Sequence, residues 1–425
     1  MLNALLKKMI YAGLGLLLII KACSPADRAQ STQVKSGLDR VVESDYKGFE
    51  DKSLGIICNH TTKDRTGKHI VDLFHNNGKS TVKSIFAPEH GFRGDESAGA
   101  KIEDDIDPRT GAKIYSLYGK TRKPTPEMLA GVDALIYDIQ DVGVRFYTYI
   151  STMSYCMEAA AENNIPIYVL DRPNPIRGDI VEGPILKEGY ESFVGMHPIP
   201  IRYGMTAGEL AVFINSEGYL KNQVKADLKV VELKGWEREQ WYDQTDLPWI
   251  APSPNMPDLE TAIVYPGMCF MEGTNLSEGR GTNTPFLLFG APWLDSKAIA
   301  QKLNNMNMPG INFSTTEFAP VEIPGKAYNP KYQDEKCQGI KLHITDRNQY
   351  RPVGSTIKIL YTVYKTHPDQ FQWRKSSIDR LTGSSKLRET FTENGSIDSL
   401  ISDWQMEADA FKKFSKKYYI YGEEK

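Results

Sequence analysis

An alternation of short apolar segments with helical segments restricts the fold of the first 230 residues more than any other feature. The apolar segments lie at 53–58, 82–87, 134–137, 166–170 and 229–233. Helices are expected at 68–76, in a segment that ends at Asn163, and at 205–217, where Thr206 and Glu209 have the spacing of a capping box. This alternation predicts an α/β fold with a mostly parallel sheet.

Polar and ionisable residues directly follow four of the apolar segments. In chain order they are Asn59 and His60, then Glu89 and His90, then Asp138 to Asp141, then Asp171, Arg172 and Asn174. Parallel strands place their carboxyl ends on one edge of the sheet, where ligands bind in open α/β folds. Polar residues after a single strand usually belong to a solvated loop, but polar residues after four successive strands favour a binding or catalytic site.

Charge and glycine patterns exclude several classes of ligand. The 51 basic residues nearly balance the 54 acidic ones, and no basic tract is interleaved with aromatic residues, so we expect no nucleic-acid partner. No dinucleotide motif follows the first strand, and GRGTNTP at 279–285 lacks the lysine of a phosphate loop. We therefore expect no nucleotide cofactor.

Metal binding is an alternative that the residue types leave open. His60, His90, Asp138 and Asp141 can all bind metal ions, which would suit a metal-dependent hydrolase. However, no HxH or HExxH pair presents two ligands on one element, and the acidic loop at 94–110 lacks the ligand spacing of a calcium loop. We expect no metal cofactor.

The N-terminal segment is typical of a targeting signal. Lys7 and Lys8 precede an apolar run at 9–20 that is short for a membrane span. Residues 1–23 resemble a bacterial lipoprotein signal, with Cys23 as the lipidated residue, and 24–37 form a polar tether. We expect an exported protein that faces the periplasm or the cell surface and touches the membrane only through its lipid anchor.

The rest of the chain divides into three segments. Residues 38–250 form the predicted α/β domain, and 296–425 a smaller α+β domain. Residues 251–295 are rich in proline, glycine and asparagine, and we expect them to be irregular and to cover the strand ends. The last predicted helix carries an apolar stripe expected to lie in the core, composed of Leu400, Trp404, Ala408, Phe411 and Phe414.

Four cysteines lie beyond the targeting segment, at 58, 156, 269 and 337. They show no CxxC spacing, and three of them lie in apolar surroundings. We expect buried free thiols, since neither a disulfide framework nor a zinc site is indicated.

Carboxylates gathered with arginine, tyrosine and asparagine suit acid-base chemistry on a polar substrate. Glycoside hydrolysis is the simplest such reaction. It requires one protonated carboxyl group for the leaving oxygen and a second group that activates water or stabilises the sugar cation. A glycan-binding protein without turnover is the alternative from another class.

At these residues the chain resembles the NamZ-type exo-β-N-acetylmuramidases of bacteria. The matching motifs are CNHT (58–61), FAPEHGFRG (86–94), YSLYG (115–119), YDIQDVGVRFYTYISTM (137–153), LDRPNP (170–175), PSPNMP (252–257) and EGTNLSEGRGTNTPF (272–286). The resemblance implies a Rossmann-like domain joined to a smaller C-terminal domain. It also implies release of terminal N-acetylmuramic acid from the non-reducing end of peptidoglycan fragments that contain N-acetylmuramic acid and N-acetylglucosamine.

The resemblance also implies roles for individual residues. Glu89 is the expected general acid, and the second catalytic group remains open among Asp138, Asp141, Asp171 and Glu278. The 2-acetamido group of the substrate is a further candidate nucleophile. Selectivity for the lactyl carboxylate requires a cation, and the candidates are Arg93, Arg145, Arg172 and Arg280. The remaining expected substrate-binding residues are His60, His90, Tyr147, Asp171, Asn174 and Asn255.

Overall fold

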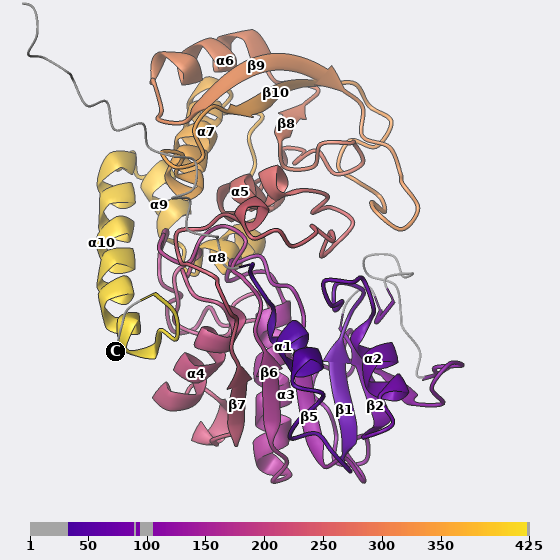
Figure 1. Ribbon diagram of the computed structural model, residues 1–425. Helices are drawn as coiled ribbons and strands as arrows, with labels where there is room; N and C mark the ends of the chain where they lie inside the picture. The colour runs from indigo at the N-terminus through magenta and orange to yellow at the C-terminus, as the bar shows by residue number, and fades with distance from the viewer. Residues whose placement is uncertain (1–32, 89–90, 94–104, 423–425) are drawn as a thin grey trace, which may run out of the picture. The chain divides into compact units, whose positions relative to one another are not determined.

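A seven-stranded sheet forms the first half of the computed structural model, which describes residues 33–88, 91–93 and 105–422 (Figure 1). The strands are β1 (Ser53–Cys58), β2 (Thr81–Ala87), β3 (Asp105–Ile106), β4 (Lys113–Ser116), β5 (Ala134–Asp138), β6 (Ile167–Leu170) and β7 (Leu228–Val231). Their order is β3-β4-β2-β1-β5-β6-β7, and every pairing in this described sheet is parallel except that of β3 with β4. The predicted mostly parallel sheet is confirmed.

Side chains of the central strands point alternately into two apolar cores. Leu54 and Ile56 of β1 lie in a core shared with α1 (Gly37–Glu43) and α2 (Ile70–Asn76), whereas Ile57 lies in a core shared with α3 (Tyr149–Glu162) and α4 (Ala207–Glu217). Helices therefore cover both faces of the sheet, as Figure 1 shows. Burial on both faces explains why these strands are almost continuously apolar in sequence.

The strand order reverses at β1. From β1 the chain moves outward through β2 to β4 and then returns to β5 on the other side of β1. In doubly wound sheets this reversal opens a crevice at the carboxyl ends of the strands. The register pairs Cys58 with Asp138, so the segments that follow β1 and β5 begin side by side at this crevice. The four polar strand ends belong to the adjacent strands β2, β1, β5 and β6.

A smaller antiparallel sheet lies in the second half, with the order β8-β10-β9. Its strands are β8 (Leu288–Ala291), β9 (Ile311–Phe318) and β10 (Cys337–Ile344). The helices of this half are α5 (Leu259–Met268), α6 (Ser296–Asn305), α7 (Pro352–Thr366), α8 (Lys375–Thr382), α9 (Lys386–Thr392) and α10 (Ile397–Ser415). Helix α6 packs against β9, β10 and α7, and α7 also contacts α5 and α10. The predicted smaller second domain is confirmed.

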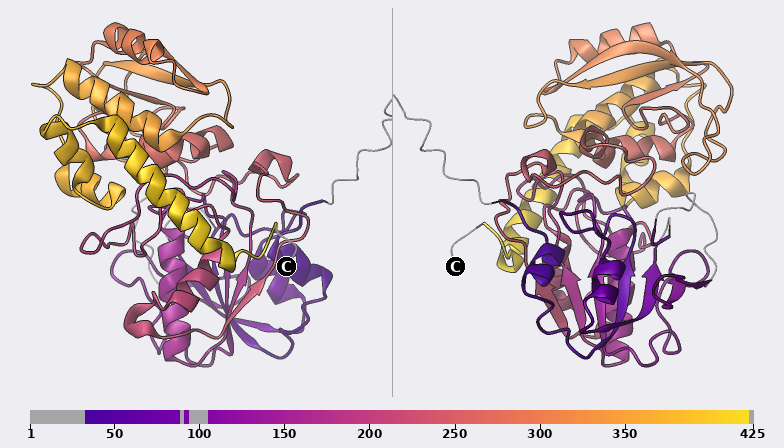
Figure 2. Two further views of the ribbon diagram at one scale, coloured as in Figure 1. Left: turned by 90° about the vertical axis from the view of Figure 1, so that its left-hand side faces the viewer. Right: turned by 45° about the vertical axis from the view of Figure 1, so that its right-hand side comes forward.

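Helix α10 returns from the second half toward α4 of the first (Figures 1 and 2). The rings of Phe411 and Phe213 lie 5.5 Å apart between centroids, and the Tyr421 hydroxyl donates to Asp171 Oδ2 at 2.7 Å. Four residues of the predicted stripe are buried, but Phe414 is 43% exposed, so its assignment to the core was wrong. Its ring lies at the edge of the aromatic contact with Phe213, where the helix meets solvent.

The segment 251–295 is more regular than predicted. It contains α5, the 3-10 helix η4 (Cys269–Gly273) and β8. Pro266 and Gly267 contributed to the prediction of an irregular segment, yet both residues lie within α5. A Cβ on Gly267 would lie 2.0 Å from the Pro352 carbonyl oxygen of α7, so this glycine permits a close helix crossing.

The cysteines agree with the prediction. Cys58, Cys156, Cys269 and Cys337 are free and buried. Within the part of the chain that the structure describes, none of the helices combines the length and the apolar character needed to cross a membrane.

Candidate active site

Several of the sequence-predicted side chains line three of the hollows in the described structure. The α2 pocket, of about 730 Å³, includes His60 and Arg93. The inner pocket, of about 130 Å³, includes Tyr147 and Asn255. The outer pocket, of about 630 Å³, includes Glu278, and Arg280 lines both the inner and the outer pocket. A volume of several hundred Å³ is typical of small-molecule sites, and the outer pocket has that size.

Both halves of the chain contribute walls to the outer pocket. Tyr118 and Val194 come from the first half, and the second half supplies Glu272, Glu278, Arg280, Lys326, Tyr328, Lys331, Arg374 and Arg380. The Leu117 amide donates to the Ala87 carbonyl oxygen at 2.8 Å, so the wall at Tyr118 adjoins the carboxyl end of β2. The outer pocket therefore lies beside the strand end that leads, in sequence, to the PEHGF motif.

The loop between η4 and β8 positions Glu278 and Arg280. Ser277 exchanges two backbone hydrogen bonds with Gly290 of β8, and the Phe286 amide donates to the Glu278 carbonyl oxygen at 2.7 Å. Arg280 lies between Gly279 and Gly281, whose φ angles of 80° and 81° belong to the left-handed region. Residues with side chains rarely adopt this conformation, which accounts for the EGRG sequence.

The outer pocket contains a dense charge network. Arg280 donates through Nε and Nη2 to Glu272 Oε1 at 3.0 and 2.8 Å, and its Nε lies 3.7 Å from Glu278 Oε1. Glu278 Oε2 lies 3.0 Å from Lys331 Nζ. Burial disfavours the charge of Arg280, but Glu272 and Glu278 outweigh this effect and raise the pKa of its guanidinium. The pocket can therefore offer anionic and cationic groups to one substrate.

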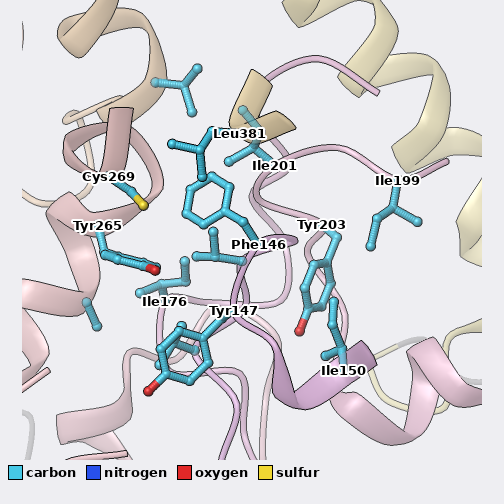
Figure 3. Close-up of a cluster of buried hydrophobic side chains, with 14 of the residues drawn as sticks. Phe146, Tyr147, Ile150, Ile176, Ile199, Ile201, Tyr203, Tyr265, Cys269 and Leu381 are labelled. Atoms are coloured by element: carbon cyan, nitrogen blue, oxygen red, sulfur yellow. The ribbon is translucent and has the colours of Figure 1, made fainter. Parts of the chain in front are cut away.

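Aromatic residues from both halves surround the inner pocket. The ring of Tyr265 from α5 lies 5.4 Å from Phe146, 5.9 Å from Tyr147 and 5.0 Å from Phe286 between centroids. Figure 3 shows Phe146, Tyr147 and Tyr265 gathered in this buried cluster. Asn255 donates to the Lys326 carbonyl oxygen at 2.6 Å, whereas its buried Oδ1 has no hydrogen-bond partner in the described residues.

Asp138 and Arg172 form a buried ion pair below the strand ends. Asp138 has no exposed surface, and Arg172 donates to both of its carboxylate oxygens, with Nη2 at 2.9 Å from Oδ2. Burial raises the pKa of Asp138, and the guanidinium of Arg172 opposes this change. Arg172 reaches only a hollow of about 30 Å³, roughly the volume of one water molecule. Both side chains are bonded to each other within the fold, and their expected roles in catalysis and substrate binding stay predictions.

Asp141, Asp171 and Asn174 are also held inside the first half. Asp141 accepts from the Gly143 amide at 2.6 Å and from the Tyr203 hydroxyl, and burial raises the pKa of its carboxyl to about 6. Asp171 accepts from Thr206 Oγ1, the Gly208 amide and Tyr421 Oη at 2.6 to 2.8 Å. Asn174 donates to the Met205 carbonyl oxygen and accepts from the Ile176 amide. These bonds join loops and the start of α4, and the expected functional roles of the three residues stay predictions.

Arg145 is committed to backbone groups. Its guanidinium donates to the carbonyl oxygens of Pro184 and Ile199 at 2.7 Å and of Leu381 at 2.9 Å, and the side chain is only 1% exposed. Burial lowers the pKa of Arg145 to about 9. Because Leu381 belongs to α8, this arginine joins the two halves. Its expected contact with the substrate stays a prediction.

The α2 pocket contains the other predicted cation. Arg93 Nη2 lies 3.2 Å from Asp107 Oδ1 and 3.4 Å from Asp72 Oδ1. His60 Nε2 lies 2.7 Å from the Ala251 carbonyl oxygen. Among the described residues, no group of three or more histidine, cysteine or carboxylate side chains has the arrangement of a metal site. Glu89, His90 and Cys23 lie outside the described residues, so the structure does not place them.

Several pocket residues escaped prediction. Glu272 lies in the EGTNLSEGRG motif and could have been suspected from its distance of six residues from Glu278. Lys331, Arg374 and Arg380 lie outside all the quoted motifs, and nothing in their local sequence indicates a site. They reach the pocket only because the β9–β10 loop and helix α8 with its preceding residue Arg374 fold toward it.

Comparison with known proteins identifies the family. Residues 54–260 match the profile "Exo-beta-N-acetylmuramidase NamZ, N-terminal", and 263–421 match "Exo-beta-N-acetylmuramidase NamZ, C-terminal". The chain belongs to the NamZ family. Peptidoglycan beta-N-acetylmuramidase NamZ of Bacillus subtilis (strain 168) is 44% identical over 395 residues, which cover 92% of each chain.

Solved structures show the same architecture as this NamZ-family chain. A DUF1343 family protein from Bacteroides fragilis NCTC 9343 superposes with a TM-score of 0.85 at 38% identity, covering 92% of this chain and 99% of the other. A second DUF1343 family protein from the same strain gives a TM-score of 0.76 at 35% identity, covering 92% and 100%. Both halves of the NamZ fold are therefore present here.

Proposed function

We propose that this chain is an exo-β-N-acetylmuramidase that releases terminal N-acetylmuramic acid from the non-reducing end of peptidoglycan fragments. The observation that carries the proposal is the match of both NamZ profiles, which together span nearly all described residues. The similarity to the B. subtilis peptidoglycan β-N-acetylmuramidase supports the same reaction and substrate class. The outer pocket, of about 630 Å³ and rich in carboxylates and cations, supports a polar saccharide as the ligand.

The proposed mechanism uses two carboxyl groups. Glu89 donates a proton to the glycosidic oxygen as the bond to N-acetylmuramic acid breaks. Of the four candidates for the second group, Glu278 is the one that lines the outer pocket, where Lys331 and Arg280 lie beside it. A carboxylate at this position can activate water or orient the substrate's acetamido group. We therefore propose Glu278 for the anionic role.

The lactyl carboxylate of N-acetylmuramic acid requires a cation. Arg145 and Arg172 are already bonded within the fold, and Arg93 lies in the α2 pocket beside two aspartates. Arg280 lines both the inner and the outer pocket. We propose that Arg280 binds the lactyl carboxylate, since a guanidinium can bind a carboxylate and still retain a second partner.

Arg280→Gln tests this assignment. We expect the affinity for free N-acetylmuramic acid, measured by calorimetry, to fall by about tenfold or more, because a charge-assisted hydrogen bond contributes about 1.5–3 kcal/mol. Affinity for N-acetylglucosamine, which lacks the lactyl group, should change much less. Arg93→Gln is the matched control, and a larger loss in that variant would assign the carboxylate to the α2 pocket instead.

Two disaccharides of opposite order test the overall function. Purified protein should release N-acetylmuramic acid from N-acetylmuramyl-β-1,4-N-acetylglucosamine and leave N-acetylglucosaminyl-β-1,4-N-acetylmuramic acid intact. Chromatography with mass detection separates the products. Binding by calorimetry without any product would identify a glycan-binding protein instead.

We also propose that the protein is an exported lipoprotein anchored through Cys23. The support is the order of the N-terminal sequence, in which two lysines and an apolar run precede the cysteine. Cells that express the Cys23→Ser variant should fail to incorporate labelled palmitate into this protein. Equal labelling of the variant and the wild type would overturn the proposal.

A further inference from the structure

We infer that Lys331 is a positioning residue that places a fixed cation beside the Glu278 carboxyl group in the outer pocket. The effect of Lys331 on hydrolysis rests on the proposed function. Its placement beside Glu278 follows from the contacts alone. Lys331 lies in the loop between β9 and β10, outside every motif that identifies the family in this sequence. It acts on the substrate only through Glu278.

The ammonium group of Lys331 has three oxygen neighbours. Nζ donates to the carbonyl oxygens of Met271 and Leu276, each at 2.7 Å, and lies 3.0 Å from Glu278 Oε2. An ammonium group has three N–H donors, and two of them are used by these carbonyl oxygens. The two carbonyls hold Nζ in place, at ion-pair distance from Glu278 Oε2.

The surroundings make this cation important. The side chains of Lys331 and Glu278 are 11% and 6% exposed, so water screens their interaction only weakly. Burial lowers the pKa of Lys331, and Glu278 opposes that change. The neighbouring charged groups are Arg280, Glu272 and Arg374, and Cys269 from η4 also faces Glu278. Arg280 pairs with both Glu272 and Glu278. Lys331, in contrast, forms its ion pair in this network with Glu278.

This arrangement defines what Lys331 contributes to hydrolysis. Arg280 Nε lies 3.7 Å from Glu278 Oε1, and Lys331 places a positive charge 3.0 Å from Oε2. Without it, Glu278 takes up a proton more readily and gains freedom to rotate. An enzyme that needs Glu278 as an anion would then lose activity on the acidic side of its pH profile.

Three variants of the full protein test the inference. Lys331→Met removes the cation, Lys331→Arg keeps it, and Lys326→Met removes a cation that lines the same pocket but has no ion pair with Glu278 among the described contacts. We expect the acidic limb of the kcat profile to move to higher pH by about one unit or more in Lys331→Met. Lys331→Arg should restore most of the wild-type profile, and Lys326→Met should move it less than Lys331→Met. An unchanged limb in Lys331→Met, or an equal shift in Lys326→Met, would overturn the inference.

A readout independent of turnover separates this inference from the proposed function. The ¹³C signal of the Glu278 carboxyl carbon, identified by its absence in Glu278→Gln, reports protonation directly. Its titration midpoint should rise in Lys331→Met even if the wild type cleaves no saccharide. In that case the proposed function fails, but the role of Lys331 stands. A midpoint that does not move would refute the role of Lys331, whatever the activity.

Folding of the variant is the remaining control. Lys331→Met leaves two carbonyls and a buried carboxylate without their cation, so we expect it to unfold at a lower temperature than the wild type. If it does not fold, the double variant Glu278→Gln and Lys331→Met should recover folding, because the uncompensated charge is gone. A double variant that also fails to fold would show that Lys331 serves the two carbonyls rather than Glu278, and would overturn the inference.

Discussion

Glu89→Gln is expected to lower kcat by at least about a hundredfold, the scale of a lost general acid. Glutamine has nearly the same shape but has no acidic proton to donate to the glycosidic oxygen. The expectation follows from the position of Glu89 in the PEHGF motif, directly after the end of β2, and from family membership. Steady-state kinetics on N-acetylmuramyl-β-1,4-N-acetylglucosamine measures the effect, and circular dichroism verifies the fold.

Glu127→Gln provides a matched control. This variant has the same chemical change, but at an exposed turn of the first half. Its kcat should therefore remain close to that of the wild type. A leaving group that needs no protonation should also be cleaved by Glu89→Gln with a much smaller loss. Near-wild-type turnover of the natural disaccharide by Glu89→Gln would remove this residue from the acid role.

Arg172→Met is expected to cost about 3–5 kcal/mol of the free energy of unfolding, because it leaves the carboxylate of Asp138 buried without its partner. The loss should depend on pH. Without the guanidinium, the folded-state pKa of Asp138 rises further above its unfolded value. A carboxyl group whose pKa is raised in the folded state contributes stability at low pH, and this stability is lost as the pH rises through the raised pKa. The variant should therefore lose more free energy of unfolding, relative to the wild type, at pH 8 than at pH 5. Urea unfolding at the two pH values measures both effects.

Two further variants make this test specific. Adding Asp138→Asn to Arg172→Met removes the uncompensated charge and should recover part of the loss. Arg347→Met breaks the exposed pair with Asp243, and it should cost about 1 kcal/mol or less. If Arg172→Met is no more destabilising than Arg347→Met, the ion pair does not hold the strand ends of β5 and β6 together.

Local patterns were sufficient to predict most of the first half. The β1 segment at 53–58 has the predicted boundaries, because both of its faces are buried and its sequence is continuously apolar. Thr206 and Glu209 form the predicted capping box, since that motif depends only on residues three apart. The Pro-Gly pair in α5 misled the prediction, because its glycine serves a contact with α7 that is distant in sequence.

The sequence did not show which of the predicted site residues line a pocket and which are bonded inside the fold. Asp138 and Glu278 both lie in matched motifs, but one is completely buried against Arg172 and the other lines a pocket. Arg145 looked like a ligand for an anion, yet its partners are three backbone carbonyls from distant segments. Such partners are set by tertiary packing, which residue type and spacing do not encode.

The most direct test of the account is a time course on the tetrasaccharide that alternates N-acetylmuramic acid and N-acetylglucosamine and begins with N-acetylmuramic acid at the non-reducing end. An exo-β-N-acetylmuramidase removes that terminal sugar once and then stops, because the new end is N-acetylglucosamine. Mass spectrometry should therefore detect N-acetylmuramic acid and one trisaccharide in equal amounts. Disaccharide products from internal cleavage, or an unchanged tetrasaccharide in the presence of folded protein, would contradict the account.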